Sequence, residues 1–309
     1  MTGSTGGRVE VPMHNDELNQ PQSQIEELRQ QARALLRRGE YEQALGIYDE
    51  ALALTDDDET RELLAINKAD AMIALERTGP EVHELPRVIM RRRHPRHVYL
   101  AAYALQYKHR LEGDLKRALF YGQLALRTAE EASEPSWRRI VLLELGNIYV
   151  HDSQIPQAID CFTESMAISE ESPLQEKELS HSYALESLGY CLLLQGDLET
   201  GLKRIYESLE LLHDPTGRAE AYIDLCYGYL ENGQFEKALF YGQAGLDISE
   251  DPRQTRNAHY LLGEACYKSG DDEGADFHFS ELSKFYPQFR NLKHLLYAID
   301  LRSMVNLKL

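Results

Sequence analysis

A short phrase recurs along the chain, and this repetition constrains the fold more than any other feature of the sequence. Its first copy is Gly39-Glu40-Tyr41-Glu42-Gln43-Ala44-Leu45. The small residue near the end of each copy falls at positions 44, 118, 158, 201, 238 and 275, at intervals of 74, 40, 43, 37 and 37 residues. Because 74 is twice 37, one divergent copy is expected between Thr60 and Arg96. The pattern predicts one cooperative array of similar units.

Each phrase is typical of a turn that leads into an amphipathic helix, with apolar residues at helical spacing. A second apolar helical face precedes every turn, so each unit is expected to be a helix-turn-helix. Small residues are expected where two helices cross closely, at Gly146, Gly189, Cys226 and Gly263. In the divergent unit, Pro80 and Pro86 fall within the expected second helix and predict that this helix is short or broken.

The pattern of these units resembles the tetratricopeptide repeat (TPR). One unit matches it with Leu142, Leu145, Gly146, Tyr149, Ala158, Phe162 and Ser165. Another matches it with Leu262, Gly263, Ala275, Phe279 and Pro287. Units of 37 to 43 residues exceed the roughly 34 of the standard repeat, and they resemble the longer units of regulatory TPR arrays.

The resemblance implies an all-α fold, a right-handed superhelical TPR solenoid of about seven helix-turn-helix units. We expect a disordered N-terminal tail at 1–22, the repeat array at 23–289 with its divergent second repeat at about 60–96, and a C-terminal capping helix at 290–309. Apolar residues on two faces of that last helix predict that it mediates self-association, most simply as a homodimer, or docks a partner. The alternative is that it folds back on the last repeat of a monomer.

Charge and hydropathy exclude two classes of partner. The chain has 33 Lys and Arg against 51 Asp and Glu, a net charge of −18, and this balance disfavours nucleic acid. No run is apolar enough to span a membrane, and the first 24 residues lack the apolar core of a signal peptide. A cytoplasmic protein is therefore expected.

Motifs for catalysis, cofactors or metals are lacking from the sequence. It has no HExxH, GxxxxGK[ST], GxSxG or GxGxxG run and no CxxC pair. Cys161, Cys191, Cys226 and Cys266 lie on apolar or small-residue helical faces, so they are expected to be buried structural thiols. Paired acids such as Asp56-Asp57-Asp58 stand at turns, where helix caps are expected. We predict no enzyme, no cofactor and no metal.

First helices line the concave surface of TPR arrays, and their outward positions here are rich in tyrosine. Tyrosine combines a rigid apolar ring with a hydrogen-bonding tip, which favours recognition of a peptide or partner helix. The candidate groove consists of Arg29, Arg33, Tyr103, Tyr107, Leu143, Asn147, Glu186, Tyr190, Ile223, Asp224, Tyr227, Tyr260, Glu264 and Tyr267. The resemblance implies that Asn147 holds the main chain of a ligand. The alternative is that these tyrosines pack against one another.

A basic island interrupts this acidic sequence. It contains Arg87, Arg91, Arg92, Arg93 and Arg96. Guanidinium groups bind carboxylates and phosphates through two hydrogen bonds, so the island is a candidate docking point for an anion or an acidic partner. The alternative is that it closes the divergent repeat and pairs with nearby acids such as Asp56 to Glu59.

The function favoured by the sequence is a non-enzymatic scaffold or adaptor that binds a partner peptide or helix in the tyrosine-rich groove. Acids in the groove, Glu186, Asp224 and Glu264, favour a partner segment that carries Lys or Arg. The alternative function is a ligand- or peptide-responsive sensor that acts on an effector in another chain.

Overall fold

The computed structural model describes residues 20–170 and 174–285, which divide into two compact bodies. The N-terminal body extends to Lys108 and the C-terminal body begins at His109, so the boundary falls inside one helix. The described residues form fourteen α-helices and a short 3-10 helix, and no strand. The all-α prediction is therefore confirmed.

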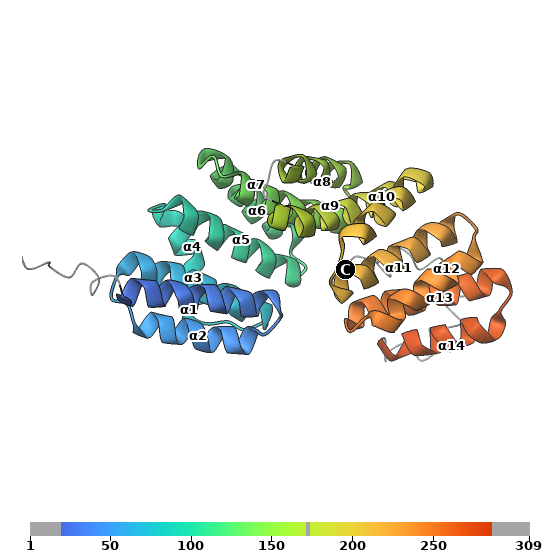
Figure 1. Ribbon diagram of the computed structural model, residues 1–309, viewed down its shortest axis with the longest axis horizontal. Helices are drawn as coiled ribbons and strands as arrows, with labels where there is room; N and C mark the ends of the chain where they lie inside the picture. Colours follow the sequence, from blue (N-terminus) through green and yellow to red (C-terminus); the bar gives the residue numbers. More distant parts are fainter. Residues whose placement is uncertain (1–19, 171–173, 286–309) are drawn as a thin grey trace, which may run out of the picture. The chain divides into compact units, whose positions relative to one another are not determined.

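The helices follow the predicted repeat (Figure 1). The N-terminal body holds α1 (Gln20–Arg37), α2 (Tyr41–Ala53), α3 (Asp58–Ala74), α4 (Pro80–Arg91) and most of α5 (Pro95–Leu111). The C-terminal body holds α6 (Leu115–Glu131), α7 (Pro135–His151), α8 (Ile155–Glu170), α9 (Leu174–Leu194), α10 (Leu198–Leu211), α11 (Pro215–Glu231), α12 (Phe235–Ile248), α13 (Pro252–Ser269), α14 (Asp272–Leu282) and the 3-10 helix η1 (Ser283–Phe285).

Successive helices pair as first and second helices of hairpins, as the repeat predicts, and in the N-terminal body α1 packs on α2 and α3 on α4. In the C-terminal body α7 packs on α8, α9 on α10, α11 on α12 and α13 on α14. Each first helix there also contacts the next first helix, α7 with α9, α9 with α11 and α11 with α13. The first helices therefore form a continuous row, which is how a TPR solenoid buries its apolar faces.

The recurring turns place a residue in the left-handed region, and three of them add an acidic helix cap, at Asp114, Asp197 and Asp271. Gly113 has φ +71° just before α6, and the Asp114 carboxylate accepts a hydrogen bond from the Arg117 amide. The copy that lacks glycine places Ser153 in the same left-handed region, at φ +57°. The acidic cap predicted within Asp56-Asp57-Asp58 is confirmed at Asp57, which accepts from the Thr60 amide at 2.8 Å.

The divergent second repeat is the hairpin of α3 and α4, where the sequence expected it. Pro80 opens α4, where a helix does not need the missing amide. Pro86 lies inside α4 and is exposed, yet the helix continues to Arg91. The second helix is therefore short, at 12 residues, and not broken.

Close helix crossings occur where the sequence placed small residues. A Cβ on Gly146 would lie 2.7 and 2.8 Å from two ring atoms of Phe162, and closer still to a third. Gly263 meets Phe279 in the same way three repeats further on. Each glycine thus admits the aromatic ring of its own second helix, because a side chain there would occupy the same space.

Three of the four cysteines are buried as predicted, namely Cys191, Cys226 and Cys266, and all four are free thiols. Cys161 is only half-buried, because it lies at the edge of α8 and not on its packed face. Burial raises the pKa of the Cys161 thiol to about 12 and that of Cys266 to about 11. Thiols with raised pKa values are poor nucleophiles, which fits a structural role.

No described helix is long and apolar enough to cross a membrane. Helix α1 begins at Gln20, inside the segment 1–22 that the sequence assigned to a tail. The rest of that segment, the capping helix predicted at 290–309 and the dimer contact through it lie outside the described residues.

Candidate binding surface

A cavity of about 320 Å³ lies among the first helices of the C-terminal body. Its walls come from the last turn of α5 and from α7, α9, α11 and α13, so five successive first helices contribute. The lining residues are Arg110, Leu143, Glu144, Asn147, Val150, His151, Tyr183, Glu186, Ser187, Tyr190, Thr216, Gly217, Glu220, Arg253 and Gln254. The cavity combines apolar stems with charged groups of both signs, which is the composition of a binding site for a polar ligand.

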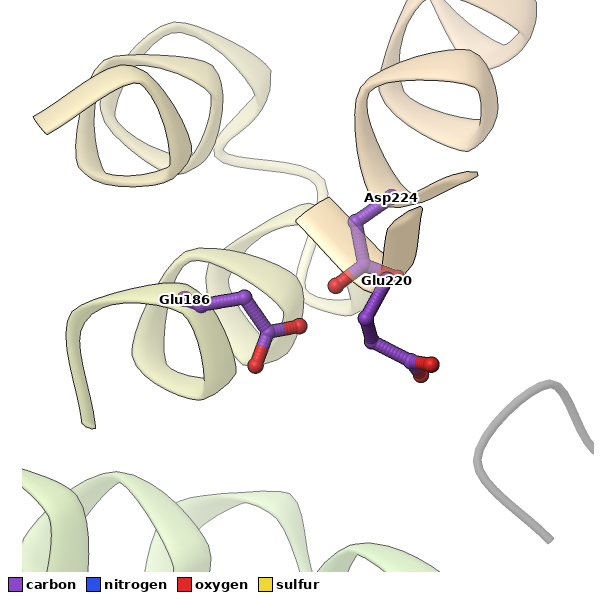
Figure 2. Close-up of side chains that lie close together, drawn as sticks. All are labelled: Glu186, Glu220 and Asp224. Atoms are coloured by element: carbon purple, nitrogen blue, oxygen red, sulfur yellow. The ribbon is translucent and has the colours of Figure 1, made fainter. Parts of the chain in front are cut away.

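Three carboxylates converge beside this cavity (Figure 2). Glu186 projects from α9 toward Glu220 and Asp224, which lie one turn apart on α11, and one oxygen of each is within 4.8 Å of the others. Glu186 and Asp224 are buried, and Glu220 is half-buried. Carboxylates held this close repel one another in a medium of low polarity, so the cluster attracts a cation. Oxygen ligands of this kind suit either a hard metal ion or an organic cation.

Donor groups on α13 contact the same cluster from the other side. The Gln254 amide donates to Glu220 at 2.8 Å and to the Thr216 carbonyl at 3.0 Å. The Arg253 guanidinium lies 3.9 Å from Glu220. Glu220 is thus partly neutralised by α13, whereas Glu186 accepts a hydrogen bond from the Ser187 hydroxyl on its own helix. The geometry thus holds Glu220 between α11 and α13.

Hydrogen bonds at the start of α11 stabilise the edge of the cavity. The Asp214 carboxylate caps this helix by accepting from the Gly217 amide at 2.6 Å and also accepts from the Tyr183 hydroxyl at 3.0 Å. Burial and then the charge of Asp214 raise the pKa of Tyr183, because both disfavour the phenolate. The tyrosine therefore remains a donor and connects α9 to α11.

Four residues of the predicted groove meet in this cavity, namely Leu143, Asn147, Glu186 and Tyr190. A fifth, Asp224, lies beside Glu186. Leu143 and Asn147 are half-buried and accessible from the cavity, whereas Tyr190 is almost fully buried. The sequence thus identified one wall of the cavity and part of its acidic cluster.

Other predicted groove residues lie in the core instead of lining the cavity. Ile223, Tyr227 and Tyr260 are buried in the apolar core of the C-terminal body. The rings of Tyr190 and Tyr227 are 5.9 Å apart, so these two tyrosines pack on one another. The sequence assigned these tyrosines to a binding surface because helical spacing shows on which face of the helix a side chain lies, but not how deeply it is buried. In the structure, neighbouring repeats cover that face.

At the C-terminal end of the row, Glu264 and Tyr267 lie on the last turns of α13. Glu264 forms an ion pair with Lys268 at 2.6 Å, and Tyr267 is exposed. Neither lines the cavity. Their assignment to a partner surface stays a prediction.

In the N-terminal body the predicted groove positions have a basic character. Arg29 is buried on α1 and pairs with both oxygens of Glu26, while Arg33 is exposed one turn later. Burial, and then the charges of Arg29 and Arg33, lower the pKa of Arg96, which starts α5. Arg96 therefore acts electrostatically with the α1 arginines, a grouping that the sequence did not reveal. Tyr103 and Tyr107 are half-buried on α5 and lie in the same body.

Much of the basic island pairs with acids of its own repeat. Arg91 bridges Glu62 on α3 and Glu84 on α4, and Arg87 also pairs with Glu84. Of the segment Asp56 to Glu59 that the sequence suggested, Glu59 lies 3.5 Å from the His94 ring, whereas the two arginines pair with acids outside that segment. Arg92 and Arg93 follow α4 and are exposed. The pairing gives at least Arg87 and Arg91 a structural role.

Sequence reasoning missed several cavity residues, chiefly Tyr183, Glu220, Arg253 and Gln254. One signal was available for Glu220, which lies four residues before Asp224 and so shares its helix face. Arg253 and Gln254 lie in the first turn of α13, where the sequence pattern is explained by the start of the helix and gives no separate indication of binding.

Comparison with known proteins supports the repeat architecture. A tetratricopeptide repeat family model matches residues 28–62. The photosystem I assembly protein Ycf3 of Synechococcus elongatus is 23% identical over 116 residues, which are 36% of this chain and 67% of the relative.

Two solved structures share the fold over most of the chain. A Rap protein complexed with competence and sporulation factor superposes with a TM-score of 0.69 at 15% identity, covering 87% of this chain and 78% of the other. The apo form of the quorum sensor NprR from B. thuringiensis gives 0.69 at 16% identity, covering 92% and 81%. The chain therefore has the fold of a tetratricopeptide repeat array, and residues 28–62 match the model of that family.

Proposed function

We propose that this protein is a non-catalytic binding module whose C-terminal body takes up an extended segment of a partner protein or a peptide. The observation that carries the proposal is the cavity of about 320 Å³ enclosed by successive first helices. A space of this size, open on one side, accommodates a few side chains of a segment and not a whole domain. Fold relatives that include a Rap protein complexed with a factor are consistent with this use of the row.

The charge of the cavity selects the kind of segment. Glu186, Glu220 and Asp224 gather three carboxylates at one place, and a Lys or Arg side chain brings the cation that they attract. Asn147 on α7 also lines the cavity and offers both a donor and an acceptor to a passing backbone. The segment that fits is therefore extended and carries a basic residue.

Peptide arrays test the proposal directly. The probes are two arrays of immobilised random decapeptides, one with a fixed central lysine and a matched one with a fixed central glutamate. We expect the full-length protein to bind many spots of the lysine array and few of the glutamate array. The strongest binders, made with a fluorescent label, then give dissociation constants by anisotropy.

Charge-removing variants show whether the cavity is responsible. Glu186→Gln and Glu220→Gln keep the shape of each side chain, and each is expected to weaken binding by about 30-fold or more, since unpairing a buried charge costs about 2 kcal/mol or more. The matched control is Glu236→Gln, which removes an exposed acid from α12 and is expected to leave affinity unchanged. Equal binding to the two arrays, or equal affinity of all three variants, would contradict the proposal.

The sensor function is tested with the same peptides. A sensor changes conformation when the ligand binds, because the ligand must favour one state over another. Small-angle scattering with and without the best peptide is expected to change for a sensor and to stay the same for a scaffold.

A further inference from the structure

Two histidines face each other inside the last described hairpin. His259 lies on α13 and His278 on α14, and their Nδ1 atoms are 3.1 Å apart. Both side chains are buried, with 7% and 8% of their surface exposed. The pair belongs neither to the cavity nor to the apolar core cluster of the C-terminal body.

The geometry of the rings fits an N–H···N hydrogen bond between them. The ring centroids are 5.3 Å apart, close to the largest separation that this N···N distance permits. The two nitrogens therefore point straight at each other, as a linear N–H···N hydrogen bond requires. Two nitrogens that held one metal ion would instead converge on a third point, with the rings closer together.

The hydrogen bond between the two rings limits how many protons they can bind. In the neutral pair one ring donates from Nδ1 and the other accepts at Nδ1, so the two rings are different tautomers. A first added proton goes to the free Nε2 of the donor ring, and the hydrogen bond between the rings survives. A second proton has to occupy the accepting Nδ1. Both facing nitrogens then carry hydrogens, and two positive rings lie in contact inside the hairpin.

The charged groups of the described residues that act on the pair come from three places. Glu281 on α14 favours protonation of both rings, and Asp271 at the turn before α14 favours that of His278. Lys284 on η1 opposes protonation of His259, and it also binds Glu281 at 2.6 Å. These influences partly offset one another.

We propose that His259 and His278 form an acid-sensitive clasp, which holds α14 against α13 while they share a proton and opens when both rings are protonated. The clasp acts on the last described hairpin. It is independent of the cavity and of any ligand bound there.

The direction of the pH dependence follows from burial. Desolvation, and then the charge of His259, lower the pKa of His278 to about 4, and desolvation also lowers the pKa of His259. The unfolded hairpin takes up its protons near pH 6.5. The stability that the pair contributes is therefore complete above about pH 6.5 and is lost as the pH falls toward about 4.

Nitrogen NMR of the full-length protein tests the shared proton. The imidazole nitrogens of ¹⁵N-histidine-labelled protein are assigned by comparison with His259→Gln and His278→Asn. At pH 7.5 we expect one ring of the pair to carry its hydrogen on Nδ1 and the other on Nε2. Two rings that both carry hydrogen on Nε2 would overturn the proposal, because neither could then donate across the contact.

Hydrogen exchange tests the opening. Exchange rates of α14 amides, corrected for the intrinsic effect of pH, are followed from pH 7 to pH 4 by mass spectrometry. In the wild type we expect protection of α14 to fall at least tenfold more than protection of α8.

The variant His278→Asn keeps a polar atom near the position of Nδ1 but does not titrate, so its α14 protection is expected to lose most of this pH dependence. His213→Asn, which removes an exposed histidine, is the control and should behave as the wild type. If α14 and α8 lose protection together in the wild type, or if His278→Asn keeps the full pH dependence, the clasp does not exist. The tautomer measurement on the wild type decides the question even if a variant fails to fold.

Discussion

The substitution Gly146→Ala is expected to destabilise the α7–α8 hairpin, although alanine is the better helix former. The new Cβ would lie 2.7 Å from Cζ and 2.8 Å from Cδ1 of Phe162, with Cε1 closer still. Phe162 is fully buried, so its ring has no free space into which to move. The two helices must then separate, or the ring must leave its preferred rotamer.

The magnitude follows from two opposing effects. Overpacking a well-filled core costs about 1–3 kcal/mol, and three ring contacts below normal distance place this site at the upper end. Replacing glycine by alanine inside a helix contributes about 1 kcal/mol of stability. The net loss is therefore about 2 kcal/mol. Gly46→Ala on α2 is the matched control, because nothing lies within 4 Å of its added methyl group, and it is expected to stabilise by about 1 kcal/mol.

The single tryptophan makes the measurement local. Trp137 lies on α7, the same helix as Gly146. Urea denaturation followed by its fluorescence is expected to shift to a midpoint lower by about 1 M in Gly146→Ala, for a slope of about 2 kcal/mol per molar urea. Hydrogen exchange of α2 amides reports the opposite change in Gly46→Ala.

A second substitution separates overpacking from any other effect. Phe162→Leu shortens the side chain that meets the new methyl group, so the double variant is expected to be more stable than the sum of the single losses predicts, by about 1 kcal/mol. Losses that simply add, or a Gly146→Ala protein as stable as the wild type, would refute the argument that the glycine is required by the ring.

Three further predictions concern turns, caps and side-chain hydrogen bonds. Gly113→Ala is expected to cost about 1–2 kcal/mol because φ is positive there, whereas Ser153→Gly should stabilise by a similar amount; thermal unfolding by circular dichroism measures both, and shifts of the same sign would contradict the reasoning. Asp214→Ala removes the acceptor of the Gly217 amide and should cost about 1 kcal/mol, seen as faster hydrogen exchange in the first turn of α11 and not at the start of α13. Tyr206→Phe removes a hydroxyl bonded to two neighbouring tyrosine hydroxyls and should cost about 1 kcal/mol in urea unfolding; an unchanged midpoint would mean that water replaces these bonds without loss.

The sequence was sufficient to predict the repeated hairpins, because each unit depends on the same interactions between residues that are close in sequence. A left-handed turn and a small residue at the crossing recur every 37 to 43 residues over the last four copies, and two of these copies add an acidic cap, at Asp197 and Asp271. All of these features depend on neighbours close in sequence. The same repeat pattern located the divergent second hairpin from an interval of twice the period. It left open whether α4 would break at Pro86, since an exposed proline in a short helix is decided by packing.

The tertiary structure decided how deeply each side chain is buried and which side chains it contacts. Helical spacing marks the outward face of a first helix, but the neighbouring repeats determine that Tyr227 and Tyr260 on that face are buried while Asn147 lines a cavity. The contact between Glu186 and Glu220 joins residues on different helices, and that between His259 and His278 joins two helices of one hairpin. Side-chain direction across a helix interface depends on the separation and rotation of the two helices, and these are set by how the side chains interlock. The sequence by itself therefore determined the array and its turns, whereas the binding surface and the histidine pair exist only where packed helices bring distant residues together.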